Sequence, residues 1–280
     1  MIPCRDHPAP LNNRHAINRT RVTRLRSRHG FTLMELLVVA FIIGALLSLI
    51  LPNLDTARSA AREISCLNNQ RSIGQAIAYY AHDQDGRIPY GPKARPSSIA
   101  DFYVIDGLVT SQVSILSGGK PVGVGLLLES YLFDLPQVVF CPETDQPQDA
   151  EAELAKVGHT QAVSNYFYRH GSNTLESALQ PKRTWDDHIL LENMGLNRRG
   201  RPIRALLMDQ QFVVNPPLPV FNIFTRTNHR QRISNTLFTD GHAESLPNRD
   251  RRYTADIGNA LQLGPTTMLK VFESADDQMN

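Results

Sequence analysis

HGFTLMELLVVAFIIGALLSLILP, residues 29–52, is the stretch of sequence that decides the fold. The run from Phe31 to Leu51 carries one charged side chain, Glu35, and follows a basic segment that ends at His29. As a helix with a rise of about 1.5 Å per residue, this run is about 31 Å long, which matches a hydrocarbon core of roughly 30 Å. The sequence therefore predicts a single membrane-spanning helix.

The position of Glu35 within this run needs an explanation. An ionised carboxylate inside lipid costs several kcal/mol unless a partner neutralises it. One interpretation is an ordinary membrane anchor that tolerates one polar residue. The other is that Glu35, five positions after Gly30, has a function inside the membrane.

The segment GFTLMELLVV, residues 30–39, resembles the processing and methylation signal of type IV prepilins and type II secretion pseudopilins. The resemblance implies that a prepilin peptidase cleaves between Gly30 and Phe31 and that the new terminal Phe31 is N-methylated. It also implies that Glu35 pairs with the terminal amine of a neighbouring pilin or pseudopilin subunit. The fold implied is an α+β, pilin-like one, with a long N-terminal helix packed on a mostly antiparallel sheet.

Charge is distributed unevenly along the chain. The first 30 residues hold seven arginines and one aspartate, which leaves 22 basic and 26 acidic residues for the rest. Because basic residues beside a membrane span stay on the cytoplasmic side, the leader is predicted to be cytoplasmic and the C-terminal part exocytoplasmic. This predicts a single-pass protein of the bacterial inner membrane, with any filament in the periplasm or on the cell surface.

Helical spacing continues after the membrane run, so one long helix is expected to leave the bilayer. Its predicted apolar stripe comprises Leu54, Ala57, Ala61, Ile64, Leu67, Gly74, Ile77, Ala78 and Ala81. The helix should end at Asp83–Gly86, because Gly86 can adopt the left-handed capping conformation. We therefore divide the chain into a basic leader, a transmembrane and assembly helix, its soluble continuation, a globular α+β exocytoplasmic domain and a polar C-terminal tail, at residues 1–30, 31–52, 53–85, 86–265 and 266–280.

The globular domain contains several predicted strands. NYFYR (165–169) and ALLM (205–208) are typical of strands, and the second ends at Asp209. GLLLESYLFDLPQVVFCPET (125–144) predicts a short helix at 126–132 and a strand at 138–140. TLFT, Asp240-Gly241 and HAESL predict a hairpin with a type I′ turn, in which Thr239 faces His242.

A second resemblance covers most of the chain in scattered blocks. CLNNQRSIGQAIAYYAHDQDGRIP (66–89), the stretch 125–144 and NTLFTDGHAE (235–244) together resemble prepilin-like proteins with a C-terminal H-x9-DG domain, abundant in planctomycete-type bacteria. That group has nine residues between the histidine and Asp-Gly, whereas ten separate His229 from Asp240 here. The spacing leaves the equivalence of His229 open.

Four side chains form a candidate metal site: Asp209, His229, Asp240 and His242. Imidazoles and carboxylates at one sheet edge could hold Zn²⁺, or the carboxylates could hold Ca²⁺. The alternative is that Asp240 serves the turn, Asp209 ends a strand, and the histidines pack at the surface. The sequence itself requires no cofactor.

Two cysteines remain after removal of the leader, which contains Cys4. Cys66 and Cys141 could form a disulfide in an oxidising compartment, and two buried free thiols are the alternative.

The sequence favours assembly over catalysis. Hydrolase motifs such as Gly-x-Ser-x-Gly and His-Glu-x-x-His are absent, and no basic stripe outside the leader indicates nucleic-acid binding. We expect a structural subunit of a type II secretion pseudopilus or a type IV-like pilus, whose partners are prepilin peptidase, other subunits and membrane lipid. A membrane-tethered exocytoplasmic binding module is the alternative, followed by an exocytoplasmic enzyme.

Overall fold

The computed structural model describes residues 30–89, 111–114, 118–169, 189–217, 224–256 and 265–279. The chain divides into two compact units between Leu51 and Pro52. Its longer elements are the helices α1 (Leu33–Asp83), α2 (Ala150–Leu154) and α4 (Pro265–Asp276) and the strands β3 (Tyr166–Tyr168), β4 (Ala205–Asp209), β6 (Ile233–Phe238) and β7 (Ala243–Pro247). Shorter pieces are β1 (Gln112–Ser114), β2 (Ala162–Val163), β5 (Phe212–Val213), β8 (Ala255–Asp256) and the 3₁₀ turns η2 (Gly123–Leu127), η3 (Pro136–Val139), η5 (His229–Gln231), η6 (Arg249–Arg251) and η8 (Asp277–Met279).

The long N-terminal helix is confirmed, and each end has a recognisable cap. At its start the Thr32 amide donates to Glu35 Oε2 at 2.9 Å and the Glu35 amide donates to Thr32 Oγ1 at 3.2 Å, which is a capping box. At its end the Gly86 amide donates to the Ala81 carbonyl at 2.7 Å, and Gly86 has φ +84°. Asp85 has φ +54° as well, so Asp85 and the expected left-handed Gly86 end the helix together, with the 6→1 bond of a Schellman motif.

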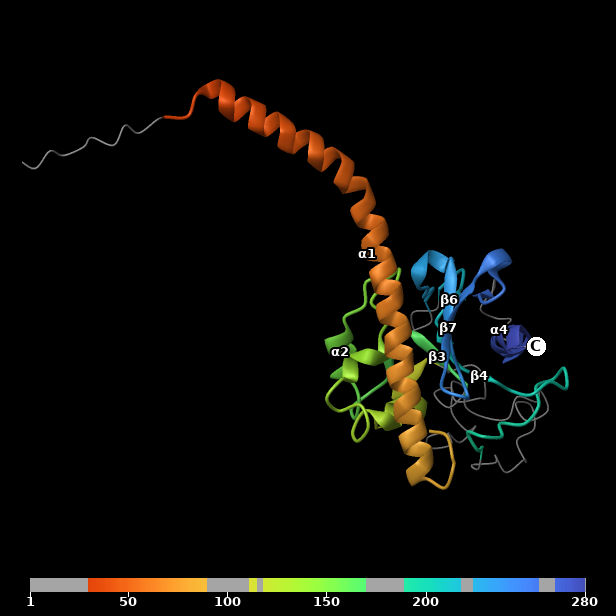
Figure 1. Ribbon diagram of the computed structural model, residues 1–280. Helices are drawn as coiled ribbons and strands as arrows, with labels where there is room; N and C mark the ends of the chain where they lie inside the picture. Colours follow the sequence, from red (N-terminus) through yellow and green to blue (C-terminus); the bar gives the residue numbers. More distant parts are fainter. Residues whose placement is uncertain are drawn as a thin grey trace, which may run out of the picture. The chain divides into compact units, whose positions relative to one another are not determined.

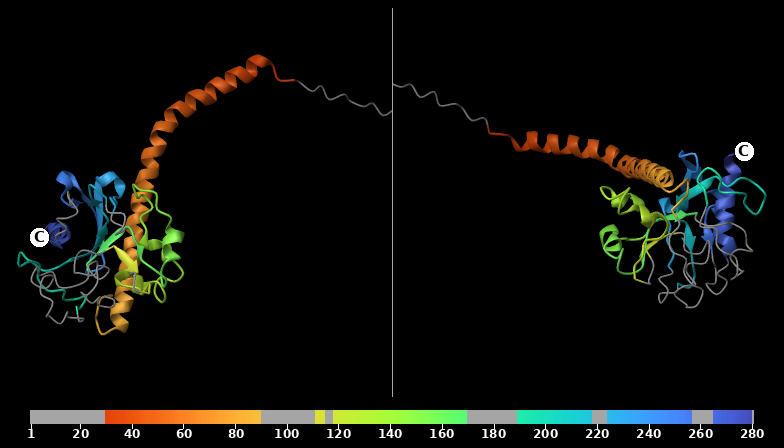
Figure 2. Two further views of the ribbon diagram at one scale, coloured as in Figure 1. Left: turned by 180° about the vertical axis from the view of Figure 1, so that it is seen from behind. Right: turned by 90° about the horizontal axis from the view of Figure 1, so that it is seen from below.

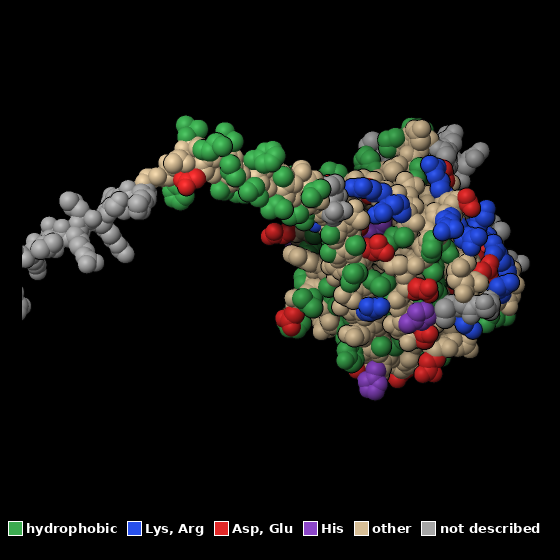
Figure 3. Space-filling view, turned by 45° about the horizontal axis from the view of Figure 1, so that its top comes forward, with side chains coloured by type: hydrophobic (Ala, Val, Ile, Leu, Met, Phe, Trp, Pro, Cys, Tyr) green, Lys and Arg blue, Asp and Glu red, His purple; other side chains and the backbone are tan. Residues whose placement is uncertain are grey.

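The first half of α1 exposes its apolar side chains. Phe31 is 89% exposed and Leu33 82%, and the large apolar residues that follow up to Leu51 are exposed as well. Figure 3 shows apolar side chains along the whole of this segment. Within the described part of the chain, Leu33–Leu51 is the one stretch long and apolar enough to cross a membrane.

The second half of α1 packs into the globular unit through a stripe at helical spacing. The buried side chains of this stripe are Cys66, Gln70, Ile73, Ile77 and Ala81. Gly74 lies beside them, and a Cβ added there would come within 2.8 Å of Leu237 on β6, so glycine permits a close approach of helix and strand. The predicted stripe is wrong at its start, because Leu54 and Ile64 are exposed and Cys66 takes the inward position, and it is wrong again at Ala78, which is exposed.

A four-stranded antiparallel sheet of order β3-β4-β6-β7 forms the centre of the globular unit (Figures 1 and 2). Tyr166 of β3 pairs with Asp209 of β4, and Met208 of β4 pairs with Thr236 of β6. The smaller sheets are the antiparallel pair β1-β2 and the parallel pair β5-β8. The α+β class and the predicted strands at 165–169 and 205–208 are confirmed.

The central sheet lies between two helices. Tyr166, Leu207 and Leu237 share an apolar cluster with Ile73 and Ile77 of α1. Side chains on the opposite face pack against α4, and this second cluster contains Phe167, Ala205, Met208, Phe238, Leu246, Tyr253, Ala255, Val271, Phe272 and Ala275. The layers are therefore α1, sheet and α4.

Helix α4 contradicts the expected polar tail at 266–280. Leu269, Phe272 and Ala275 recur at three-residue spacing and are buried. Asp276 pairs with the buried Arg169, with Arg169 Nη1 2.9 Å from Asp276 Oδ1, and also accepts hydrogen bonds from the amides of Arg204 and Ala205. The sparse apolar residues of this segment were sufficient for one buried helical face.

Two local predictions are wrong for reasons of backbone geometry. Residues 136–139 form a 3₁₀ turn and not a strand, because Pro136 starts a turn in which the Phe140 amide donates to the Gln137 carbonyl at 3.1 Å. Residues 123–127 likewise form a 3₁₀ turn where a helix was expected at 126–132.

The hairpin is present, but its turn differs from the predicted type. Gly241 has φ +87°, whereas Asp240 does not adopt a positive φ, as a type I′ turn would require. The Gly241 amide donates to the Phe238 carbonyl at 3.0 Å and the Phe238 amide donates to the His242 carbonyl at 2.9 Å. The loop therefore has three residues, and His242 lies opposite Phe238, not Thr239, with the two rings stacked at 4.4 Å.

Candidate functional site

The N-terminal candidate residues lie at the exposed start of α1. Gly30 and Phe31 precede the first helical turn and are exposed. Glu35 faces Thr32 across the capping box, so its carboxylate already stabilises the helix start within a single chain. Two functions must therefore be separated for Glu35, namely capping its own helix and pairing with another subunit.

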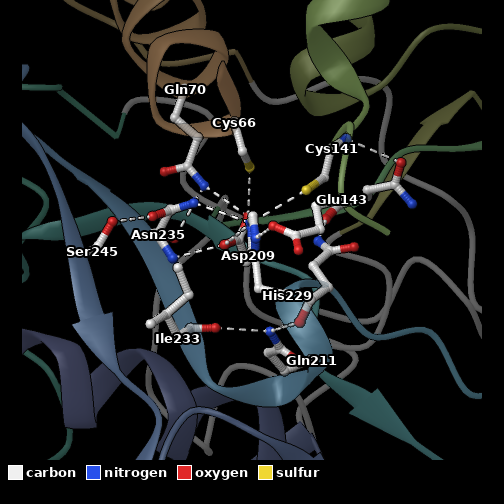
Figure 4. A network of polar contacts seen from close by, with 12 residues as sticks. Cys66, Gln70, Cys141, Glu143, Asp209, Gln211, His229, Ile233, Asn235 and Ser245 are labelled. Atoms are coloured by element: carbon white, nitrogen blue, oxygen red, sulfur yellow. Dashed lines mark hydrogen bonds and ion pairs between the residues drawn. The ribbon is translucent and has the colours of Figure 1, made fainter. Parts of the chain in front are cut away.

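A second candidate site is buried in the globular unit. One ligand atom each from Cys66, Cys141, Asp209 and His229 lies within 4.8 Å of all the others, and all four residues are buried. Cys66 comes from α1, Asp209 from the end of β4, His229 from η5, and Cys141 follows η3. Figure 4 shows the four side chains converging from these segments. We call them the Cys₂-Asp-His cluster.

The contacts within the cluster are short. Cys66 Sγ lies 3.1 Å from Asp209 Oδ1, Cys141 Sγ 3.4 Å from His229 Nε2, and His229 Nε2 3.2 Å from Asp209 Oδ2. The hydroxyl of Tyr166 is 3.4 Å from Cys66 Sγ. Thiols, imidazole and carboxylate therefore face a common centre.

An outer ring of polar groups orients the cluster. His229 Nδ1 is 3.0 Å from Glu143 Oε2, and Glu143 also accepts a hydrogen bond from the Ser59 hydroxyl. Asp209 accepts from Gln70 Nε2 at 3.2 Å and from the Asn235 amide at 2.7 Å. Asn235 Nδ2 is 3.2 Å from His229 Nε2. Oδ1 of the same carboxamide accepts a hydrogen bond from the Ser245 hydroxyl (Figure 4).

Burial and the neighbouring charges shift the ionisation of the cluster. Burial raises the pKa of the Cys66 thiol well above its usual range, and it raises the pKa of Cys141 as well. Burial alone would lower the pKa of His229, but the hydrogen bond with Asp209 and the proximity of Cys66 raise it to about 11. Without a bound cation, the cluster therefore consists of two thiols and an imidazolium paired with Asp209.

An unusual backbone turn places His229. His229, Arg230 and Gln231 have φ values of 53°, 52° and 58°, a left-handed turn made of three residues that are not glycine. This conformation costs about 1–2 kcal/mol for each L-residue. The His229 amide donates to the Glu143 carbonyl at 2.9 Å and the Arg230 amide to Asp145 Oδ1 at 2.8 Å, which holds the turn against the 143–145 segment. Such strain is found where a side chain must be held in one orientation.

The four predicted metal ligands separate into two pairs. Asp209 and His229 enter the cluster, whereas Asp240 and His242 lie at the exposed hairpin turn, with His242 Nδ1 2.5 Å from Asp240 Oδ1. Side-chain exposure is 59% for Asp240 and 39% for His242, against zero for Asp209 and His229. The prediction of one four-residue site is therefore wrong.

Of the two alternatives for Cys66 and Cys141, the structure shows two buried free thiols and no disulfide. Their side chains belong to the same cluster.

Comparison with known proteins identifies the N-terminal signal. Residues 25–51 match the family model for the prokaryotic N-terminal methylation motif. This is a prepilin-type signal. No curated protein and no solved structure gives a significant match.

The prepilin-type motif lies directly on the apolar half of α1, which confirms the expected signal and its adjacent helix. The chain therefore carries a prepilin-type signal, the motif of pilin-like precursors, directly before one helix that is long and apolar enough to cross a membrane. The motif implies a prepilin peptidase as its processing enzyme. The resemblance of the rest of the chain to the H-x9-DG group stays a prediction, because the match to the methylation motif ends at residue 51.

Sequence reasoning missed several members of the buried site. Glu143, Gln70 and Asn235 were not identified, although each contacts a cluster residue. Gln70 carried a usable signal, since it follows Cys66 by four positions and a polar residue on the inward stripe of a helix needs a buried partner. Glu143 and Asn235 are recognisable only once the strands are placed.

Proposed function

We propose that this protein is a structural subunit of a type II secretion pseudopilus or a type IV-like pilus. After cleavage following Gly30, α1 would leave the bilayer sideways and pack with the same helix of other subunits. Glu35 would be neutralised by the terminal amine of Phe31 in a neighbouring subunit. The globular unit would then lie on the outside of the filament, in the periplasm or on the cell surface.

The observation that carries this proposal is the exposed apolar half of α1 directly behind the prepilin-type motif. Residues from Leu33 to Leu51 show no burial within the chain, so their apolar area is available to lipid before assembly and to other subunits afterwards. Glu35 is the one charged residue on this surface. A carboxylate in such a place requires a partner outside its own apolar surroundings.

A structural role, and not an enzymatic one, is supported by the burial of the Cys₂-Asp-His cluster. Cys66, Asp209 and His229 have no exposed surface and Cys141 is 3% exposed, so the cluster offers almost no surface to a substrate. A substrate site needs access to its reactive atoms. Burial of the Cys₂-Asp-His cluster is consistent with a centre that stabilises the globular unit.

The capping box makes a sharp test of Glu35 possible. Glutamine replaces glutamate as the reaching side chain of a capping box, so Glu35→Gln keeps the helix cap and removes the charge. Thr32→Val does the reverse, because it removes the Thr32 hydroxyl and keeps the carboxylate. We expect Glu35→Gln to insert and to be cleaved normally but to be incorporated into filaments at least tenfold less, whereas Thr32→Val assembles.

The readout is the amount of each variant in sheared or cross-linked filaments, relative to its amount in the membrane fraction. Equal incorporation of Glu35→Gln and the unchanged chain would remove the role given to the charge. If Thr32→Val is as defective as Glu35→Gln, capping and not pairing explains the residue.

N-terminal sequencing of the membrane-extracted protein separates this proposal from the alternative. A methylated Phe31 at the N-terminus is the expected result. An intact leader on the mature protein would favour the membrane-tethered binding module, which needs no release from the bilayer.

A further inference from the structure

We propose that Cys66, Cys141, Asp209 and His229 form a closed, four-ligand site for Zn²⁺. The site fixes α1 to the sheet and to the loop after η3. It lies wholly within the globular unit and does not depend on the filament role of the N-terminal helix. Its ligand set differs from the one predicted from sequence, of which only Asp209 and His229 remain.

The spacing of the ligand atoms fits a tetrahedral zinc ion. Zinc–sulfur bonds of about 2.3 Å and zinc–nitrogen or zinc–oxygen bonds of about 2.0–2.1 Å place neighbouring ligand atoms roughly 3.3–3.8 Å apart in a tetrahedron. Three of the close contacts are 3.1 Å, 3.4 Å and 3.2 Å, although they involve both oxygens of Asp209, and one ligand atom from each residue lies within 4.8 Å of the other three. Small side-chain movements that bring the wider pairs together would therefore convert the hydrogen-bonded cluster into a coordination shell.

The outer ring has the arrangement that metal-binding histidines use. Glu143 Oε2 lies 3.0 Å from His229 Nδ1, so a proton on Nδ1 is shared with a carboxylate, and once Nε2 gives up its proton its lone pair would be directed at the other three ligands. This carboxylate–histidine arrangement fixes the tautomer and the ring orientation in zinc sites. Gln70 Nε2 and the Asn235 amide hold Asp209 in the same way.

The chemistry of the donors selects the class of metal. Two thiolates and an imidazole suit zinc and related thiophilic ions, whereas Ca²⁺ and Mg²⁺ prefer shells made of oxygen. Four protein ligands from one buried cluster leave no position for a substrate, which is the pattern of structural zinc sites and not of catalytic ones. Binding of Zn²⁺ replaces the two thiol protons and any proton on Nε2, and these protons leave to solvent.

An approach to the site exists on the side of Cys141. A surface cleft of about 400 Å³ has Cys141 in its lining, together with Asn69, Phe140, Pro142, Thr144 and Asn165. Cys141 is 3% exposed, whereas Cys66 has no exposed surface. A metal ion would therefore meet Cys141 first and reach the other ligands from there.

The test uses the full chain purified in detergent, with Cys4→Ser as the common background so that the leader thiol does not interfere. The protein is reduced, stripped with a chelator, exchanged into buffer and mixed with ZnCl₂ or CoCl₂. We expect one zinc per chain by elemental analysis after desalting. Cobalt should give the thiolate charge-transfer absorption and the intense visible bands of a tetrahedral Co²⁺ ion.

Matched variants assign the metal to the cluster. Cys66→Ser and His229→Gln should each lose the stoichiometric zinc and the cobalt spectrum. His242→Gln, which changes the histidine beside Asp240 at the exposed turn, should retain both. Because a cluster variant could fail to fold, Glu143→Gln serves as the milder change, and we expect it to weaken zinc binding about 10–100-fold while the cobalt spectrum keeps its tetrahedral form.

Three results would overturn the proposal. The first is a reduced, folded chain that takes up no zinc or cobalt. The second is metal binding that survives the combined Cys66→Ser and Cys141→Ser changes. The third is a Cys66–Cys141 disulfide in the protein extracted without reductant, by intact mass, with no metal binding after its reduction.

Discussion

Two histidine–aspartate pairs lie near opposite ends of β6, and their surroundings give them different roles. His229 and Asp209 are 3.2 Å apart with no exposed side-chain surface, while His242 and Asp240 are 2.5 Å apart on an exposed hairpin turn. The shorter contact belongs to the pair that contributes less to the stability of the fold, because an exposed ion pair contributes only about 0–1 kcal/mol. Burial and the number of further partners, and not distance, therefore distinguish the two pairs.

The buried pair is fixed from every side, whereas the exposed pair serves one turn. Asp209 accepts hydrogen bonds from Gln70, Asn235 and Cys66 in addition to its contact with His229. Asp240 accepts only from the amide and the ring of His242 among the bonds that the structure describes. Substitutions at matched positions should therefore have very different effects.

The largest effect is expected for Asp209→Ala. Removal of one partner from a buried ion pair costs about 3–5 kcal/mol, because the remaining charge is left uncompensated. In chelator-treated full-length protein we expect the urea midpoint to fall strongly, measured by far-ultraviolet circular dichroism. Asp240→Ala is the matched control, and equal destabilisation by the two changes would contradict the comparison.

An intermediate effect is expected for Gly241→Ala. Gly241 has φ +87°, and a Cβ there would meet nothing within 4 Å, so the cost is conformational and not steric. A left-handed conformation costs an L-residue about 1–2 kcal/mol. Thermal unfolding of the Gly241→Ala variant and of the unchanged protein under one condition measures this loss of stability. A loss smaller than that of Asp240→Asn would show that the ion pair, and not the backbone, maintains the turn.

The smallest effect is expected for Asp240→Asn, and it should depend on pH. Partial burial opposes the shift, but the hydrogen bonds from the His242 amide and ring lower the pKa of Asp240 below its usual value. A lowered pKa stabilises the fold above the unfolded value of about 3.9, and this contribution is lost as pH falls through the folded value. The variant should differ from the unchanged chain by under about 1 kcal/mol at neutral pH.

The pH dependence of this difference is measured by unfolding both chains between pH 2 and pH 7 in steps of about one unit, a range set by the carboxyl pKa. The two stability curves should converge at the acid end. A constant difference over the whole range would show that Asp240 contributes by its shape and not by its charge.

Much of the fold could be predicted from local sequence patterns. The apolar run and Gly86 determined the extent of α1, and NYFYR, ALLM and the Asp240-Gly241 hairpin located the strands. Helix α4 could not be predicted in this way, because its four buried apolar residues are too few to stand out until a sheet face is available to cover them. The turn type depended on whether one or two residues adopt a positive φ, which Asp-Gly alone does not determine.

The candidate site was predicted in two halves that the structure joins. One hypothesis linked Asp209 with His229, and a separate one linked Cys66 with Cys141. Their union requires the position of α1 over the sheet, which depends on Gly74 packing against Leu237 and cannot be inferred from spacing along the chain. The hairpin histidine and aspartate were attractive as ligands only because the turn brings them together, whatever lies around them.

The continuity of α1 has a mechanical consequence. One helix carries both the exposed apolar segment and, further along, Cys66 and Gln70. Within the globular unit these two side chains bond to Asp209 at the end of β4. Withdrawal of this part of the helix from the globular unit would have to break both bonds together, whereas the bonds of a hairpin turn open one after another. The cluster thus retains the helix within the globular unit.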